Sequence, residues 1–142
     1  MTDTERIAAL LHEYAFRLDA GDLDGVAELF RDAELRSTDH DRVRRGSAEA
    51  RAIYDAVILG PDGTPGTMHQ ITNVQIDVNG DTASSRCYFT VLQVTAQGVQ
   101  AVLAGEYRDR FRRVEGTWGF AERTFAPKLM GDLSSHMKGR SE

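Results

Sequence analysis

The chain has 142 residues, of which 41% are hydrophobic and 27% charged, with a formal net charge of −5 and a pI near 5.4. This length and composition predict one globular domain over residues 1–142, and the net negative charge argues against nucleic acid as a partner. No apolar run approaches the roughly 20 residues that a membrane span needs, and the polar first residues are unlike a signal peptide, so we expect no membrane partner.

The first predicted helix covers residues 4–20. Thr2 and Glu5 are spaced as a capping box, and Gly21 is typical of a helix end. At about 100° per residue, Asp19 lies on the shoulder of an apolar stripe, where its carboxylate can face either solvent or a cleft. The stripe recurs at helical spacing and consists of Ile7, Leu10, Leu11, Tyr14, Ala15 and Leu18.

Shorter elements follow this helix. Asp22 is a good cap for a second helix that buries Leu23, Val26, Ala27 and Phe30. The elements expected next are, in order, a strand around residues 33–36, a charged loop at 37–46, and a third helix from 47 to about 59. Tyr54 lies on the inner side of this helix, and the Gly- and Pro-rich residues 60–66 break the chain after it.

The second half of the chain predicts a β meander with strands at 67–78, 82–95, 99–114 and 118–125. Asn79-Gly80 is a strong hairpin signal between the first two of these strands. In the first strand the apolar alternation changes parity, so we expect a bulge near Asn73 that curves the sheet. Residues 127–142 show little pattern, and we expect this tail to cover an edge of the sheet or the mouth of a pocket.

Three helices followed by an antiparallel meander predict an α+β fold with the helices packed on one face of a strongly curved sheet. This order resembles the nuclear transport factor 2-like superfamily and is most similar to its SnoaL-like branch. The resemblance implies a cone-shaped half-barrel with an internal pocket. The segments that carry it are residues 14–30, Met68-His69-Gln70-Ile71-Thr72-Asn73, residues 79–83, Gly105–Phe111 and Trp118–Arg123.

Two enzyme groups within the superfamily imply different site residues. In scytalone dehydratase, hexachlorocyclohexane dehydrochlorinase and bile acid dehydratase-like proteins, an aspartate that ends the first helix orients a histidine on the first long strand. By resemblance these roles fall on Asp19 and His69, with Tyr14 and Arg123 as the accompanying polar residue and last-strand arginine. These four are the predicted catalytic residues.

The ketosteroid isomerase group is a more distant resemblance and implies a different set. Its oxyanion pair would fall on Tyr14 and Asp109. Its aspartate base would fall at about Ser37, which cannot serve, and Asp39 is only a nearby substitute.

The residues themselves also support His69 as the reactive group. Strand alternation could point His69 into an enclosed pocket, and imidazole has an ordinary pKa near 6.5, so it can accept a proton at neutral pH. A carboxylate on its other nitrogen would fix the tautomer and stabilise the imidazolium. The alternatives are that a backbone carbonyl satisfies His69 and that Asp19 merely caps the second helix.

Other candidates also have structural alternatives. Tyr14 either packs in the core or donates to a substrate oxygen, and Arg123 either pairs with Asp109 or Glu106 or binds an anionic group. Asn73 either stabilises the bulge or touches a ligand. The residues that we expect to contact substrate are Asn73, Asp109, Tyr107, Phe89 and Tyr54.

The sequence indicates neither a metal nor a cofactor. Its histidines lack metal-ligand spacing, and no phosphate loop, nucleophile elbow or dinucleotide motif is found. We expect His12 and His40 at the solvated surface, whereas His136 could return over the pocket. Cys87 is the single cysteine, which excludes an internal disulfide and favours a reducing, cytoplasmic location.

These features favour a cofactor-independent lyase, of dehydratase type, that acts on a small hydrophobic and cyclic molecule. Double-bond isomerisation or polyketide-type cyclisation in the same pocket is an alternative. A non-catalytic module for ligand binding or assembly is a third, and we expect a homodimer or homotrimer in each case.

Overall fold

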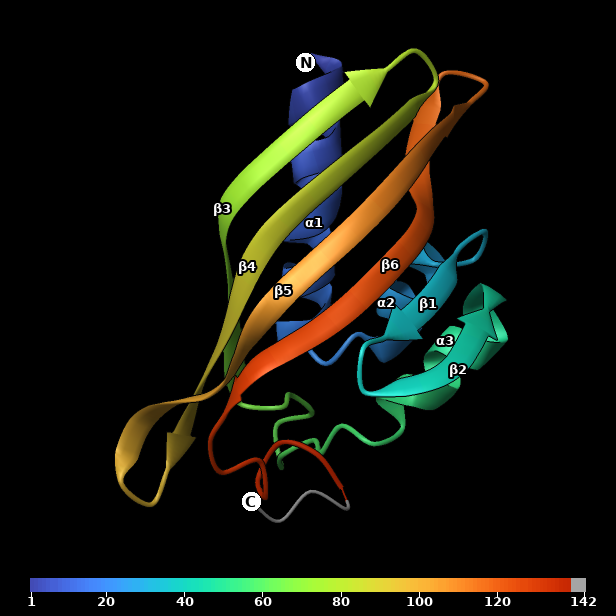
Figure 1. Ribbon diagram of the computed structural model, residues 1–142. Helices are drawn as coiled ribbons and strands as arrows, with labels where there is room; N and C mark the ends of the chain where they lie inside the picture. Colours follow the sequence, from blue (N-terminus) through green and yellow to red (C-terminus); the bar gives the residue numbers. More distant parts are fainter. Residues whose placement is uncertain (139–142) are drawn as a thin grey trace.

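The computed structural model describes residues 1–138 and shows three helices on the concave side of a curved six-stranded sheet (Figure 1). The helices are α1 (Asp3–Asp19), α2 (Leu23–Leu29) and α3 (Gly46–Tyr54). The strands are β1 (Glu34–Ser37), β2 (His40–Arg45), β3 (Thr67–Asn79), β4 (Thr82–Thr95), β5 (Gly98–Val114) and β6 (Thr117–Met130). Their order is β2-β1-β6-β5-β4-β3, so the sheet has two edges and is open. The predicted α+β fold is confirmed.

Local sequence signals set the ends of α1. Thr2 and Glu5 form the predicted capping box, with backbone to side-chain distances of 3.0 and 3.1 Å. Gly21 follows the helix with a φ of 79°, and a Cβ there would lie only 2.0 Å from the Gly63 carbonyl oxygen. Because only glycine fits this approach, the chain before β3 packs closely against the end of α1, where Asp19 lies.

Two predicted ends are wrong. Helix α3 ends at Tyr54 rather than near residue 59, because the next residues pair with the C-terminal segment, where Ile58 N donates to the His136 carbonyl oxygen at 2.9 Å. Strand β6 continues to Met130, so residues 127–130 belong to the sheet and not to the tail. Figure 1 shows the C-terminal segment and the chain after α3 side by side below the sheet.

The predicted loop at 37–46 is also partly wrong, since residues 40–45 form edge strand β2. Its side chains are mostly exposed and charged, so the sequence lacks the apolar alternation of a half-buried strand. The ion pair of Arg45 with Glu34, at 2.9 Å, spans β2 and β1. Strand β1 runs parallel to β6, with Leu35 opposite Arg123, so the sheet is not wholly antiparallel.

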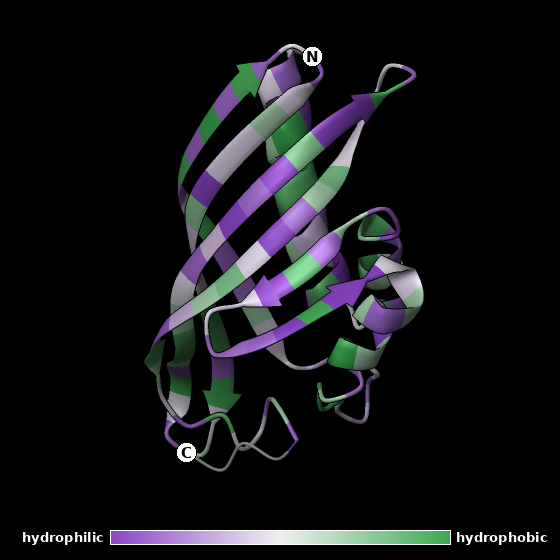
Figure 2. Cartoon of the chain, turned by 45° about the vertical axis from the view of Figure 1, so that its right-hand side comes forward, coloured by the Kyte–Doolittle hydropathy of each residue, from purple (hydrophilic) through white to green (hydrophobic). Residues whose placement is uncertain are grey.

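The predicted bulge at Asn73 is confirmed. Asn73 has a φ of 54°, and the pairing register with β4 shifts at this point. Beyond it, Ile76 and Val78 pack against the core, whereas Val74 is exposed. Figure 2 shows hydrophilic and hydrophobic residues in alternation along the strands. On β4 the buried residues are Ala83, Ser85, Cys87, Phe89, Val91 and Gln93.

Candidate functional site

A cavity of about 380 Å³ is lined by side chains of α1, α3, the sheet and the C-terminal segment. Most of its lining is apolar, including Phe89, Leu103, Phe125 and Leu133. This volume suits a small molecule, and a mostly apolar wall with few polar groups is typical of ligand sites. Tyr14, Arg123 and His136 are buried polar residues of this lining, so their electrostatic interactions are stronger than in water.

His69 from β3 and Asp19 from the end of α1 meet at the wall of this cavity. Nδ1 of His69 lies 2.6 Å from Oδ1 of Asp19. The His69 side chain is 4% exposed and that of Asp19 is 20% exposed. The same carboxylate accepts two further hydrogen bonds, from Thr67 Oγ1 at 2.8 Å and from the His69 backbone N at 2.8 Å.

These hydrogen bonds determine the protonation of the pair. Burial opposes ionisation of Asp19, but the hydrogen bonds from His69 and Thr67 and the nearby imidazole lower the pKa of Asp19 below its ordinary value. An ionised carboxylate only accepts hydrogen bonds, so Nδ1 of His69 carries the proton. In neutral His69 the lone pair is therefore on Nε2, the nitrogen that Asp19 leaves free.

Tyr14 and Tyr54 form a second polar group on the cavity wall. Their hydroxyls are buried and lie 3.0 Å apart. One hydroxyl donates to the other, which leaves one O–H of the pair able to donate to a ligand. Burial raises the pKa of Tyr54 well above its ordinary value, so this hydroxyl stays protonated. The Tyr14 ring is 6.5 Å from that of His69, between centroids.

Arg123 is held in the wall by Asp109. Its Nε and Nη2 donate to the two oxygens of Asp109 at 2.7 and 2.9 Å, and both side chains are buried. The ring centroids of Tyr107 and Tyr14 lie 3.8 and 4.4 Å from the guanidinium carbon. Burial opposes the positive charge, but the facing carboxylate raises the pKa of Arg123, so the two residues form an ion pair. Nη1 is buried and has no hydrogen-bond partner among residues 1–138.

The predicted substrate contacts divide into two groups. Phe89, Tyr107 and Tyr54 line the cavity. Asn73 and Asp109 are not part of the lining: Asn73 is exposed at its bulge, and both oxygens of Asp109 accept hydrogen bonds from Arg123.

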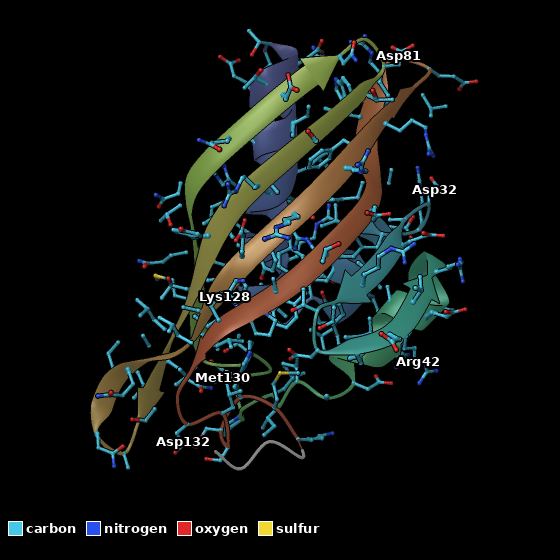
Figure 3. All side chains as sticks on the ribbon, viewed as in Figure 1. Asp32, Arg42, Asp81, Lys128, Met130 and Asp132 are labelled. Carbon is cyan, nitrogen blue, oxygen red and sulfur yellow. The ribbon has the colours of Figure 1, made fainter. Side chains whose placement is uncertain are left out.

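The other three histidines differ in their exposure and in whether they line the cavity. His12 is exposed as expected, whereas His40 is an exposed residue that nevertheless contributes to the cavity lining. His136 is buried and lines the cavity, although the tail that holds it has no periodic pattern. The spacing of Asp132 and Ser134 could have predicted a turn just before His136. Asp132 accepts hydrogen bonds from the backbone and the hydroxyl of Ser134, which is typical of a turn. Figure 3 shows Met130 and Asp132 where the chain leaves β6 and turns under the sheet.

Within the described residues 1–138, no three His, Cys, Asp or Glu side chains are grouped so that they could hold a metal ion. In the same part of the chain, no helix has the length and apolar character to cross a membrane.

Comparison with known proteins identifies the family. The model of the SnoaL-like domain matches residues 1–124, which is most of the chain. The chain belongs to the SnoaL-like family. No curated protein matches this SnoaL-like chain in sequence.

Solved structures share its fold. A variant of Rv3472, a protein of unknown function from Mycobacterium tuberculosis, is 27% identical with a TM-score of 0.75, over 90% of this chain and 73% of that one. A nuclear transport factor 2-like protein with a cystatin-like fold, from Novosphingobium aromaticivorans, is 26% identical with a TM-score of 0.75, over 94% and 86%. A protein provisionally named a scytalone dehydratase, from the same organism, is 20% identical with a TM-score of 0.71, over 99% and 95%. At that identity the last of these shows the fold alone.

Proposed function

We propose that this SnoaL-like protein is a cofactor-independent lyase that removes water from a small, largely apolar, cyclic β-hydroxy carbonyl compound. The observation that carries the proposal is the 2.6 Å hydrogen bond between His69 and Asp19 on the wall of an apolar cavity. This arrangement gives an imidazole a fixed tautomer and an anionic partner, which are the two properties that a general base needs.

In the proposed reaction, Nε2 of His69 takes a proton from the carbon next to the carbonyl. The electron pair of that C–H bond forms the double bond, the C–O bond breaks, and the oxygen leaves with its electron pair. The proton on His69 then passes to this oxygen, which departs as water, so the enzyme returns to its starting state. Asp19 stabilises the imidazolium while it exists.

The carbonyl oxygen needs hydrogen-bond donors, because negative charge grows on it as the proton leaves. The O–H that the Tyr14 and Tyr54 pair does not use internally is a donor on the wall, and the buried Arg123 guanidinium, 4.4 Å from the centre of the Tyr14 ring, adds positive charge beside it. The Asp109 carboxylate balances the charge of Arg123, so the site does not require an anionic substrate.

Two alternatives use the same cavity. A ketosteroid isomerase-like reaction would need Asp109 as a protonated donor to the substrate. Burial raises the pKa of Asp109, but both of its oxygens accept hydrogen bonds from Arg123, so neither oxygen faces a substrate. The substitute base for that reaction, Asp39, is exposed. A non-catalytic ligand-binding module remains the second candidate, since cavity and wall would serve binding equally well.

A phenyl-substituted β-hydroxycyclohexanone tests the proposal, because its product is a conjugated enone that can be followed by ultraviolet absorbance. We expect turnover by the wild type and a fall in kcat of about 10²–10⁴-fold in His69→Ala, the usual contribution of a general base. His12→Ala is the control, since His12 is exposed on α1 and outside the cavity wall. Equal turnover in His69→Ala would refute the role of His69, and ligand binding with no turnover would favour the binding module.

A further inference from the structure

The C-terminal segment after β6 delivers a second imidazole to the cavity. His136 is 3% exposed, lines the cavity, and lies 6.0 Å from His69 between ring centroids. Its Nδ1 is buried and has no hydrogen-bond partner among residues 1–138. Burying a polar atom without a partner costs free energy, so a side chain that only packs here would be better as an apolar one.

Backbone hydrogen bonds hold the segment in place. The His136 carbonyl accepts from Ile58 N at 2.9 Å, and the His136 backbone N donates to the Leu133 carbonyl at 3.0 Å. Gln93 Nε2 donates to the carbonyls of Ser135, at 3.1 Å, and Pro65, at 3.0 Å. The position of the imidazole is therefore set by contacts that use neither ring nitrogen, and Nε2 is the ring nitrogen that is not sealed from the cavity.

The two imidazoles have different surroundings. Asp19 hydrogen-bonds to His69, whereas no acidic side chain of the described residues is hydrogen-bonded to His136. Burial and the charge of His69 lower the pKa of His136 to about 4. His136 therefore stays neutral and keeps one N–H, whereas the hydrogen bond to Asp19 fixes the tautomer of His69.

We propose that His136 is a further catalytic residue, which hydrogen-bonds the leaving hydroxyl of the substrate beside His69. At a hydrogen-bond length of about 2.9 Å to each ring, one oxygen between the imidazoles can reach both. His136 donates its N–H to the oxygen as the C–O bond breaks and negative charge develops there, but it does not give up the proton. The proton that completes water comes from the His69 imidazolium, so His136 ends the step neutral, as it began. This role rests on the function proposed above.

The test uses two substitutions in the full chain. His136→Phe keeps the ring but removes the donor, and His136→Gln restores an N–H donor on a flexible side chain. With the phenyl-substituted β-hydroxycyclohexanone as substrate, we expect His136→Phe to lower kcat roughly 10²-fold, as for loss of one transition-state donor, and His136→Gln to recover part of it. His12→Phe is the matched control and should keep the wild-type rate.

A binding experiment on the wild type separates this inference from the proposed function. Ring ¹⁵N signals of His136 are compared on binding of the β-hydroxy ketone and of the same phenyl ketone without the hydroxyl. We expect a shift of the His136 signals that only the hydroxylated ketone produces, whether or not turnover is observed. Equal rates in the wild type and His136→Phe, or identical His136 signals with the two ketones, would overturn the role of His136.

Discussion

Replacing Asp19 by Asn tests the chemistry of the site with almost no change in shape. The carboxylate accepts three hydrogen bonds, of which the one from Nδ1 of His69 is the shortest at 2.6 Å. An amide has one accepting oxygen and one donating nitrogen, so Asn at this position cannot accept from all three donors. If its oxygen keeps the bond to the His69 backbone, its nitrogen faces Nδ1. His69 then changes tautomer, Nε2 carries the proton, and the base is lost.

The size of the effect follows from those contacts. Loss of the charged hydrogen bond should lower the free energy of unfolding by about 1.5–3 kcal/mol, the range for hydrogen bonds to charged groups. With the base in the wrong tautomer, kcat should fall by about 10²–10⁴-fold. Two measurements check this: enone formation from the β-hydroxycyclohexanone, and ring ¹⁵N shifts of His69, which report which nitrogen carries the proton.

Asp22→Asn is the matched control for this variant. Asp22 caps α2 through a 2.9 Å hydrogen bond to the Gly25 backbone N, and asparagine caps helices about as well as aspartate. We expect rate and stability close to those of the wild type. The reasoning would be refuted if Asp19→Asn kept Nδ1 protonated, or if it turned over at the wild-type rate with its tautomer changed.

Three further outcomes follow from the structure. Folding lowers the pKa of Asp19 below 3.8, so the stability that its carboxylate contributes is full above that value and is lost as pH falls through the lower, folded-state pKa. Urea unfolding from pH 6 down to 2 should therefore show a smaller acid-induced loss of stability in Asp19→Asn than in the wild type. In Gly105→Ala the added methyl would lie 2.4 Å from a β6 carbonyl oxygen, so we expect the free energy of unfolding to fall by roughly 1–3 kcal/mol or more. Gly119 has open space around it, so Gly119→Ala should leave stability nearly unchanged. Thermal unfolding of the two variants checks this. Arg123→Met should cost about 3–5 kcal/mol because it leaves the Asp109 carboxylate buried alone, and adding Asp109→Leu should restore most of that loss in a double-mutant cycle by urea unfolding.

The parts of the fold that the sequence predicted are those with local signals. The capping box at Thr2, the helix end at Gly21, and the parity change at Asn73 each arise from neighbouring residues, so a single sequence carries them. The pairing of His69 with Asp19 was expected only through family resemblance, since residues 50 positions apart share no local pattern. Strand β2 was missed because its charged side chains lie at an exposed edge, where burial imposes no alternation.

His136 was harder to predict for a different reason. Its segment is held mainly by backbone hydrogen bonds, which do not depend on side-chain identity and therefore leave little trace in the sequence.

Two acidic residues were predicted as possible ion-pair partners of Arg123, and the structure pairs it with Asp109. Glu106, the other, pairs instead with Arg86 and Arg108, at 3.0 and 3.4 Å. Facing positions on β5 and β6 decide between them, because Asp109 is directly opposite Arg123 in the register.

In the proposed reaction, the position of one carboxylate distinguishes the roles of the two histidines. The two imidazoles lie 6.0 Å apart between ring centroids, and an anionic hydrogen-bond partner stabilises the charged form of a ring. Asp19 provides that partner to His69. The acid in the segment of His136, Asp132, is exposed and hydrogen-bonded to Ser134, so it cannot do the same for His136. The proposed base with a proposed neutral donor beside it would suit an elimination, in which one oxygen leaves and takes back the proton. An isomerisation returns the proton to carbon, so it has no leaving oxygen that could accept a hydrogen bond from His136.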